Sequence, residues 1–106
     1  MATIDDFKKL DIRIATIKEV LDHPNADKLY ILKVDMGGRE KQLVAGIKLS
    51  YSKEALIGKQ IAVIDNLEPA IIRQQESQGM LLAAQDESGI VILSPERHVQ
   101  EGSVVR

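Results

Sequence analysis

The chain has no cysteine and no tryptophan among its 106 residues, and only one phenylalanine and two tyrosines. Without cysteine it can form neither disulfide bonds nor thiolate metal sites, and an intracellular setting is expected. So few aromatic rings count against a single-strand binder that stacks successive bases. No apolar run approaches the roughly 20 residues of a membrane span, and the N-terminus lacks the segments of a signal peptide. We therefore expect a soluble, cytoplasmic protein without a membrane partner.

The chain also lacks a large excess of charge. Its net charge of −2 argues against a protein that coats nucleic acid by bulk electrostatics. The charge is uneven, because residues 1–53 hold 10 lysines and arginines against 8 acidic residues, whereas residues 54–106 hold 4 against 8. Any contact with nucleic acid must then be local, and most positive potential is expected on the first half of the chain, together with Arg73.

Familiar catalytic signatures are missing as well. There is no Gly-x-Ser-x-Gly elbow, no phosphate-binding loop ending in Gly-Lys-Ser/Thr, and no Gly-x-Gly-x-x-Gly. The two imidazoles, His23 and His98, lie far apart in the sequence without ligand spacing, and His23 is expected in a turn or at the surface. We predict a protein that is not an enzyme and needs no cofactor and no metal.

What is present is a pattern of short apolar segments, and the length fits one domain covering residues 1–106. Thr3 and Asp6 have the spacing of a capping box, which predicts a short helix near residues 4–9 with Phe7 in the core. A strand follows from Ile12 to Leu21, with a bulge between Ile14 and Ile17. Further strands are predicted at residues 29–36, 41–47, 60–65, 79–85 and 90–93, a second helix near residues 50–57, and a loop at residues 66–78.

This order of elements predicts an all-β fold. Five or more short strands, with a short helix at the N-terminus and another between strands 3 and 4, favour a five-stranded OB-fold barrel. An SH3-like barrel is the main alternative. The loop after residue 65 is rich in hydrogen-bonding groups, and small β-domains hold much of their function in such loops. A connection that merely turns the chain is equally compatible with its residues.

Five blocks of the sequence carry a family resemblance: Asp11-Ile12-Arg13, residues 23–30, residues 44–47, residues 66–70 and residues 77–82. In order and spacing they resemble the tRNA-binding OB-fold domain, found at the C-terminus of methionyl-tRNA synthetases and as free-standing structure-specific tRNA-binding proteins. The resemblance implies binding to the outer corner of the L-shaped tRNA, by shape and backbone and without regard to sequence. It also implies a homodimer whose terminal segments help to form the interface, with methionyl-tRNA synthetase as a further partner.

The resemblance assigns tRNA-binding roles to Lys28, Asn66, Arg73, Ser77 and Met80. Lys28 and Arg73 would meet phosphates, Asn66 and Ser77 would offer neutral donors and acceptors, and Met80 would give an adaptable apolar contact. Structural roles stay open for three of them: Asn66 as a loop cap, Ser77 in a local turn bond and Met80 in the core. Second-tier candidates come from the basic half of the chain: Lys33, Lys41 and Lys48.

Three positions depart from the family pattern. The family loop commonly reads Asn-Leu-Lys-Pro-x-Lys-x-Arg-Gly, and this chain has Glu68, Ile71 and Gln74 in place of the two lysines and the glycine. The loss of two cations beside a phosphate path predicts weaker binding, unless the first half of the chain supplies the charge. Gln74 is expected to stiffen or redirect the loop.

A second hypothesis is a dimeric OB-fold export chaperone that binds unfolded polypeptides. Its relatives share an opening like residues 6–13, but as far as the resemblance goes they lack the blocks at residues 26–29 and 77–80. A third is an assembly module that docks a synthetase to its partners. We favour tRNA binding over both.

Overall fold

The computed structural model describes all 106 residues, which form two short helices and nine strands. In chain order these are α1 (Ile4–Lys8), β1 (Ile12–Asp22), β2 (Tyr30–Asp35), β3 (Glu40–Ala45), α2 (Lys53–Leu56), β4 (Gln60–Ile64), β5 (Ala70–Ile72), β6 (Gln75–Ser77), β7 (Met80–Leu81), β8 (Ala83–Asp86) and β9 (Gly89–Ile92). Neither helix has the length and apolar character that would be needed to cross a membrane.

The long strand β1 organises the main sheet, whose strand order is β3-β2-β1-β4-β7. The second half of β1 pairs with β2 and its first half pairs with β4, so one strand serves two parts of the sheet. Its register shifts between Ile17 and Glu19, which bends the strand. The predicted bulge is therefore present, but it lies after Ile17 and not before it.

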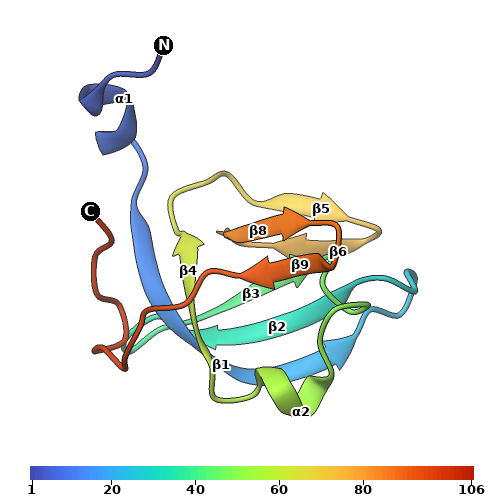
Figure 1. Cartoon of the computed structure of the whole chain (residues 1–106). Coiled ribbons are helices and arrows are strands. Elements are labelled where there is room, and N and C mark those ends of the chain that lie inside the picture. The colour runs from blue at the N-terminus through green and yellow to red at the C-terminus, as the bar shows by residue number, and fades with distance from the viewer.

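The sheet closes on itself through the chain that follows β6. The backbone N–H of Gln78 donates to the Gln42 carbonyl at 2.8 Å, and the Val44 N–H donates to the Ser77 hydroxyl at 3.0 Å. These bonds join β3 to the segment that continues into β7, and β7 pairs with β4. With α2 between β3 and β4, the result is a nearly closed, OB-fold-like barrel, which confirms the predicted fold class (Figure 1).

The barrel interior is apolar and tightly packed. Its largest fully buried side chains are Ile17, Leu32, Val34, Leu43, Leu56, Ile61 and Val63. Gly79 permits the close approach of β7 to β4, because a Cβ at this position would lie 2.8 Å from the Ile64 carbonyl oxygen. Any larger residue there would have to push the two strands apart.

The segment predicted as a loop, residues 66–78, contains the hairpin β5–β6, so that prediction was wrong. Pro69 stands just before β5, where its missing N–H costs no ladder bond. The hairpin turns at Arg73 and Gln74, whose φ angles of 51° and 76° are both left-handed. Two-residue hairpin turns need this geometry and usually use Asn-Gly, so the sequence Arg-Gln gave no turn signal.

The strand predicted at residues 79–85 is also divided in two. Leu82 separates β7 from β8, and its N–H and carbonyl bond to Ala62 and Leu93, both at 3.0 Å. After this point the chain leaves the barrel sheet, and β8 pairs with β9 in a separate hairpin. This hairpin turns between Asp86 and Gly89.

Helix α1 is where the sequence predicted it, but its packing differs. The capping box is complete, because Thr3 and Asp6 exchange side-chain-to-backbone hydrogen bonds of 3.0 and 3.2 Å. Phe7 was expected in the core and is instead 39% exposed, and no residue of α1 is buried. Figure 1 shows why, since α1 projects beyond the barrel on the same side as the C-terminal segment.

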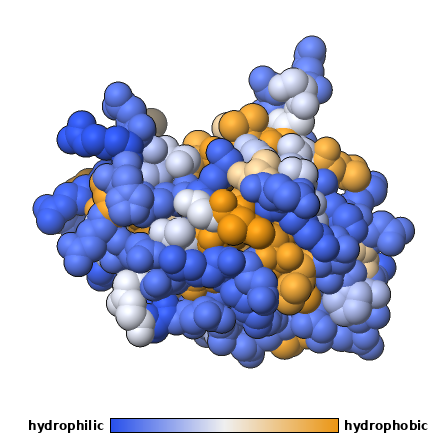
Figure 2. Space-filling view, turned by 90° about the horizontal axis from the view of Figure 1, so that it is seen from below, coloured by the Kyte–Doolittle hydropathy of each residue, from blue (hydrophilic) through white to orange (hydrophobic).

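The face of the molecule seen from below is largely polar, with apolar areas among it. The view from below shows exposed apolar side chains gathered near the middle of that face and polar side chains around them (Figure 2). Large apolar residues that remain exposed include Ile4, Leu10, Leu49, Ile57, Ile71, Val91 and Val104.

Candidate functional site

Lys28 and Arg73 line one recess of the barrel. The loop after β1 and the β5–β6 turn, which carry these two residues, lie on the side of the barrel away from α1 (Figure 1). The loop after β1 approaches the β5–β6 turn, and together they enclose about 340 Å³ lined by Ala26, Asp27, Lys28, Leu29 and Arg73. Neither Lys28 nor Arg73 forms an ion pair with a carboxylate of the protein. Their positive charge is therefore available to an anionic ligand.

A set of hydrogen bonds holds the Arg73 turn to this loop. The Arg73 guanidinium donates through Nε and Nη2 to the Asn25 carbonyl, at 3.3 and 3.0 Å. In return the Asn25 side-chain amide donates to the Arg73 carbonyl at 3.2 Å and to Oε1 of Gln74 at 3.0 Å. His23 bridges the same elements: Nδ1 accepts from the Asn25 N–H, and Nε2 lies 3.0 Å from the Ile72 carbonyl. His23 was expected in a turn or at the surface, and it is buried beneath this loop.

Ser77 is buried and its hydroxyl is fully engaged. Only 4% of the residue is exposed, and Oγ accepts from Val44 N–H while donating to the Gly79 carbonyl at 3.0 Å. Both bonds join β6 to neighbouring parts of the barrel. The hydroxyl therefore orders the turn toward β7 and is not presented to a ligand.

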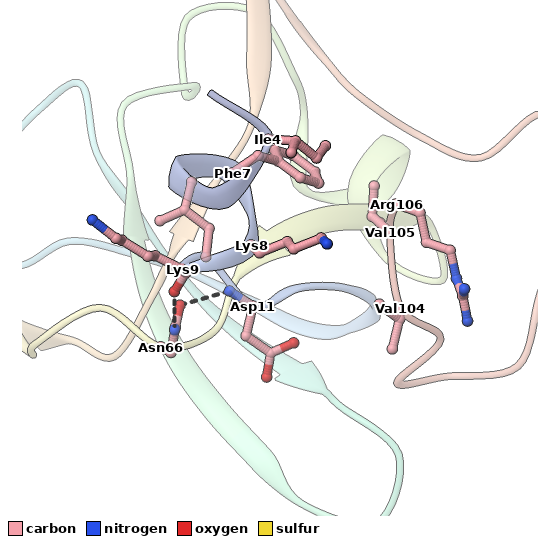
Figure 3. A pocket seen from close by; sticks show the side chains of 10 residues that line it. Ile4, Phe7, Lys8, Lys9, Asp11, Asn66, Val104, Val105 and Arg106 are labelled. Carbon is pink, nitrogen blue, oxygen red and sulfur yellow. Dashed lines mark hydrogen bonds between the residues drawn. The ribbon is translucent and has the colours of Figure 1, made fainter. Parts of the chain in front are cut away.

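Asn66 lies near the start of the connection from β4 to β5, next to α1. Its Oδ1 accepts from the Asp11 N–H and its Nδ2 donates to the Lys9 carbonyl, both at 2.8 Å (Figure 3). The side chain thus ties the end of α1 to the barrel, although the residue remains exposed. It borders a cavity of about 500 Å³ whose lining also includes Ile4, Phe7, Leu10, Val104, Val105 and Arg106.

Met80 is not a core residue. It is 49% exposed and pairs with Ile64 of β4. Ile64 in turn lies two positions before Asn66 in the chain. The structure therefore brings Lys28 and Arg73 together and places Asn66 on the α1 side. The five candidates form no single cluster.

The second-tier lysines have partners within the protein. Lys41 Nζ contacts the Asp65 carboxylate and also donates to the carbonyls of Asp65 and Gln78, at 2.8 and 3.1 Å. Lys48 pairs with Asp22 at 3.0 Å, and Lys33 donates to the side-chain oxygen of Gln42. These three cations are less available to a ligand than Lys28 and Arg73.

Asp65 is a buried carboxylate that pairs with two cations, Arg39 and Lys41. Burial raises the pKa of its carboxyl, but hydrogen bonds and ion pairs from Arg39 and Lys41 lower it by more, so the net pKa is below the ordinary value. This ionised Asp65 neutralises two cations that would otherwise face solvent. No group of three or more histidine, aspartate or glutamate side chains is placed to hold a metal ion.

Sequence reasoning missed the polar residues that organise the recess. The sequence predicted a turn or surface position for His23 and marked Gln74 as a departure from the family pattern, while Asn25 was only part of a family block. Their joint role depends on contacts across about 50 positions of sequence, which no local pattern reveals. The sequence does place His23 and Asn25 within one of the five family blocks, and that was the available signal.

Comparisons with known proteins identify the family of this chain. Residues 12–104 match the family described as "Putative tRNA binding domain". A methionine–tRNA ligase of Thermococcus onnurineus is 51% identical over 102 residues, which cover 96% of this chain and 14% of the ligase. The chain thus spans about one-seventh of the length of these curated relatives.

Solved structures show the same fold over the whole chain. A protein related to methionyl-tRNA synthetase from Pyrococcus horikoshii is 31% identical, with a TM-score of 0.92, and the match covers 100% of this chain and 98% of that one. The CsaA chaperone protein of Picrophilus torridus is 35% identical, with a TM-score of 0.94 and full coverage of both chains. The match over residues 12–104 and the identity to methionine–tRNA ligases confirm the family resemblance: this chain belongs to the tRNA-binding domain family.

Proposed function

We propose that this protein binds tRNA through its shape and phosphate backbone at the outer corner of the L, either free-standing or as an auxiliary subunit of methionyl-tRNA synthetase. One observation carries the proposal: Lys28 and Arg73 line one recess, and no carboxylate of the protein pairs with either. Family membership and identity to methionine–tRNA ligases support it. The protein acts by binding, without a catalytic step, a cofactor or a metal, and residues 1–106 form one cytoplasmic binding unit.

The candidate residues take different roles in this proposal. Lys28 and Arg73 contact phosphates, while Asn66 and Met80 contact the RNA nearer α1 through a neutral amide and an apolar side chain. Ser77 acts indirectly, since its hydroxyl orders the chain before Met80. Lys33, Lys41 and Lys48 add positive potential nearby, reduced by the partners they already have.

The spacing of these residues fits recognition of a folded RNA. Asn66 and Arg73 are seven positions apart, a span of at most about 23 Å at roughly 3.3 Å per extended residue. Asn66 comes shortly after β4 and Arg73 directly after β5, so β5 lies between them and they would meet different stretches of backbone. Contacts of this kind read the shape of an RNA and not its base sequence.

A salt titration tests the proposal. The association constant for unfractionated tRNA should fall linearly with salt on logarithmic axes, with a slope of about −0.7 to −0.9 for each phosphate contacted. Two contacts from Lys28 and Arg73 would give a slope near −1.5, by the same rule. A linear RNA of equal length is the control and should bind more weakly. Affinity that does not change with salt, or equal affinity for the linear RNA, would contradict phosphate contacts with a folded RNA.

The proposal includes a homodimer formed on the α1 side. Helix α1 has five residues and buries none of them, and isolated helices of that length are unstable in water. Val104 and Val105 line both the cavity beside α1 and a neighbouring apolar recess of about 380 Å³. The two hollows share these valines, and a second copy of the chain would cover the apolar side chains of both.

A chaperone for unfolded polypeptides is the second candidate function. The observation that favours it is the full-length match to proteins called CsaA chaperones, at TM-scores of 0.92 and 0.94. The exposed apolar side chains of Ile71 and Met80 would suit an unfolded segment. A pull-down from cell extract separates the two functions, since enrichment of tRNA supports the first and enrichment of unfolded polypeptide supports the second.

A further inference from the structure

The β5–β6 turn has a backbone geometry that its residues do not favour. Arg73 and Gln74 both have left-handed φ angles, which residues other than glycine rarely adopt. Such a conformation persists only where the surroundings hold it in place. The hairpin itself is short, with three residues in each strand, so the stabilising contacts must come from outside it.

Those contacts come from the loop that carries Lys28. Asn25 is the centre of them, because its side-chain amide donates to Arg73 and Gln74, and its carbonyl accepts both guanidinium bonds from Arg73. Gln74 stands where the family pattern has glycine, and its side chain supplies one acceptor of this set. The strained turn and the polar side chain at position 74 are therefore parts of one arrangement.

His23 fixes the geometry from beneath. Because Nδ1 accepts the Asn25 N–H, the proton of the neutral ring must be on Nε2, which donates it to the Ile72 carbonyl. The ring thus joins the backbone of the loop to the backbone of β5 just before the turn. It is buried at 5% exposure, so water does not compete strongly for these bonds.

The consequence for Arg73 is a guanidinium held in place before any ligand arrives. Two of its five N–H groups are used on the Asn25 carbonyl, and three remain for a ligand. A long flexible side chain loses conformational entropy when it binds, and a side chain that is already held loses less. Lys28 lines the same recess, so both cations are presented to one site.

We propose that Asn25, together with His23 and Gln74, is a positioning residue that latches Arg73 beside Lys28, so that the two cations face the phosphate backbone of the RNA together. The inference rests on the proposed tRNA binding and adds the residues that prepare the site. Asn25 does not contact the phosphate in this arrangement. It acts through Arg73.

A double-mutant cycle with unfractionated tRNA tests the latch. Asn25→Ala removes the two amide bonds to the turn but keeps the backbone carbonyl that accepts from Arg73, so it should weaken binding about threefold. Arg73→Gln removes the charge itself and should weaken binding about fivefold. The double variant should bind like Arg73→Gln alone, because without the guanidinium nothing is left to position. Asn25 is exposed, so Asn25→Ala is expected to fold normally.

Two further measurements separate positioning from a loss of stability. Ser52→Ala removes a comparable side-chain-to-backbone hydrogen bond at the start of α2, and it should lower stability without changing tRNA affinity. The ¹⁵N heteronuclear NOE of the Arg73 and Gln74 amides should fall in Asn25→Ala, without any RNA present. His23→Gln keeps a donor for the Ile72 carbonyl and should retain more affinity than His23→Ala.

The outcomes are distinct. Equal weakening by Asn25→Ala with and without the Arg73 guanidinium would overturn the latch, since Asn25 would then act on its own. No weakening by Asn25→Ala, while Arg73→Gln binds poorly, would overturn the latch and leave tRNA binding by Arg73 standing. Unchanged binding by Arg73→Gln would overturn both the latch and the proposed role of Arg73.

Discussion

The two sides of the barrel differ in the groups that they expose without a partner in the protein. On the α1 side, Phe7 and its apolar neighbours are exposed around a cavity, while Asn66 ties the helix to the barrel. On the opposite side, Lys28 and Arg73 lack ionic partners. A set of hydrogen bonds holds the turn that contains Arg73 against the loop that carries Lys28. Unburied apolar surface favours a protein partner, and unpaired charge favours an anion. The same small barrel is therefore suited to two different contacts.

The treatment of cations elsewhere in the chain sharpens this contrast. Asp65 pairs with Arg39 and Lys41, and Asp22 pairs with both Lys48 and Lys53. In this acidic protein, carboxylates thus pair with several cations near the sheet. The cations of the recess, Lys28 and Arg73, have no such ion pair. Local placement, and not net charge, decides where an anion can bind.

The largest expected effect is on the α1 side. Phe7→Glu should reduce the mass in solution from about twice 11.7 kDa to 11.7 kDa, because a carboxylate buried in an apolar interface is costly. Light scattering at micromolar concentration measures the change. Arg73→Gln, on the opposite side, is the control and should keep the dimeric mass. A wild-type protein that is already monomeric would defeat the homodimer.

The next effect concerns the neutralised cations. Asp65→Asn should lower the free energy of unfolding by about 2 kcal/mol, between the values for exposed and buried ion pairs. The reason is that Lys41, only 19% exposed, would lose its counter-charge. Urea denaturation measures this loss. Asp86→Asn is the control, since that carboxylate bonds only within an exposed turn and should cost less.

The difference in unfolding free energy between the wild type and Asp65→Asn should depend on pH in a defined direction. Since the folded-state pKa of Asp65 is lowered, its carboxylate stabilises the fold above the ordinary pKa of 3.8. That contribution is lost as the pH falls through the lower, folded-state pKa. Asp65→Asn should therefore differ most from wild type near neutral pH and least in strong acid. A constant difference at all pH values would show that the ionised carboxylate is not the source of the stability.

The barrel strands could be predicted because their signals are local. Alternating or continuous apolar residues mark β1 to β4, and Gly37-Gly38 marks the β2–β3 turn. The β5–β6 hairpin escaped because its strands are short and partly polar, and its Arg-Gln turn depends on contacts from residue 25. Phe7 was misplaced because a capping box and an apolar residue predict a helix but not its packing partner.

The candidate site shows the same limit. Lys28 and Arg73 could be named from the sequence, but their meeting depends on how a loop and a hairpin 45 positions apart pack together. The bonds of Ser77 to β3 arise from closure of the barrel, which has no local signature. The sequence therefore predicts the role of a residue when that role depends on its own side chain. It does not predict a role that depends on a contact between distant parts of the chain.

A charge reversal in the recess should have an effect of about one order of magnitude. Arg73→Glu is expected to weaken tRNA binding about tenfold at low salt, through the loss of one phosphate contact and repulsion of the backbone. Filter binding measures affinity, and thermal unfolding should show little change because Arg73 is exposed. Arg97→Glu, an exposed arginine outside the recess, is the control for net charge. Equal weakening by both variants would remove Arg73 from the site.

The smallest expected effect is a gain. Ile71 is 69% exposed on β5, at a position where the family pattern has lysine. Ile71→Lys should tighten tRNA binding about threefold and steepen the salt slope by about 0.7 to 0.9, as one more phosphate is neutralised.

The control for this gain is Val91→Lys, which places the same charge on β9 at an apolar position that is 51% exposed. If both lysines tighten binding equally, the gain comes from net charge and not from a phosphate path along β5. If Ile71→Lys alone tightens binding, the path runs from the Lys28–Arg73 recess along this strand. The acidic chain would then bind weakly because of two or three replaced side chains, on a surface whose geometry still fits the RNA.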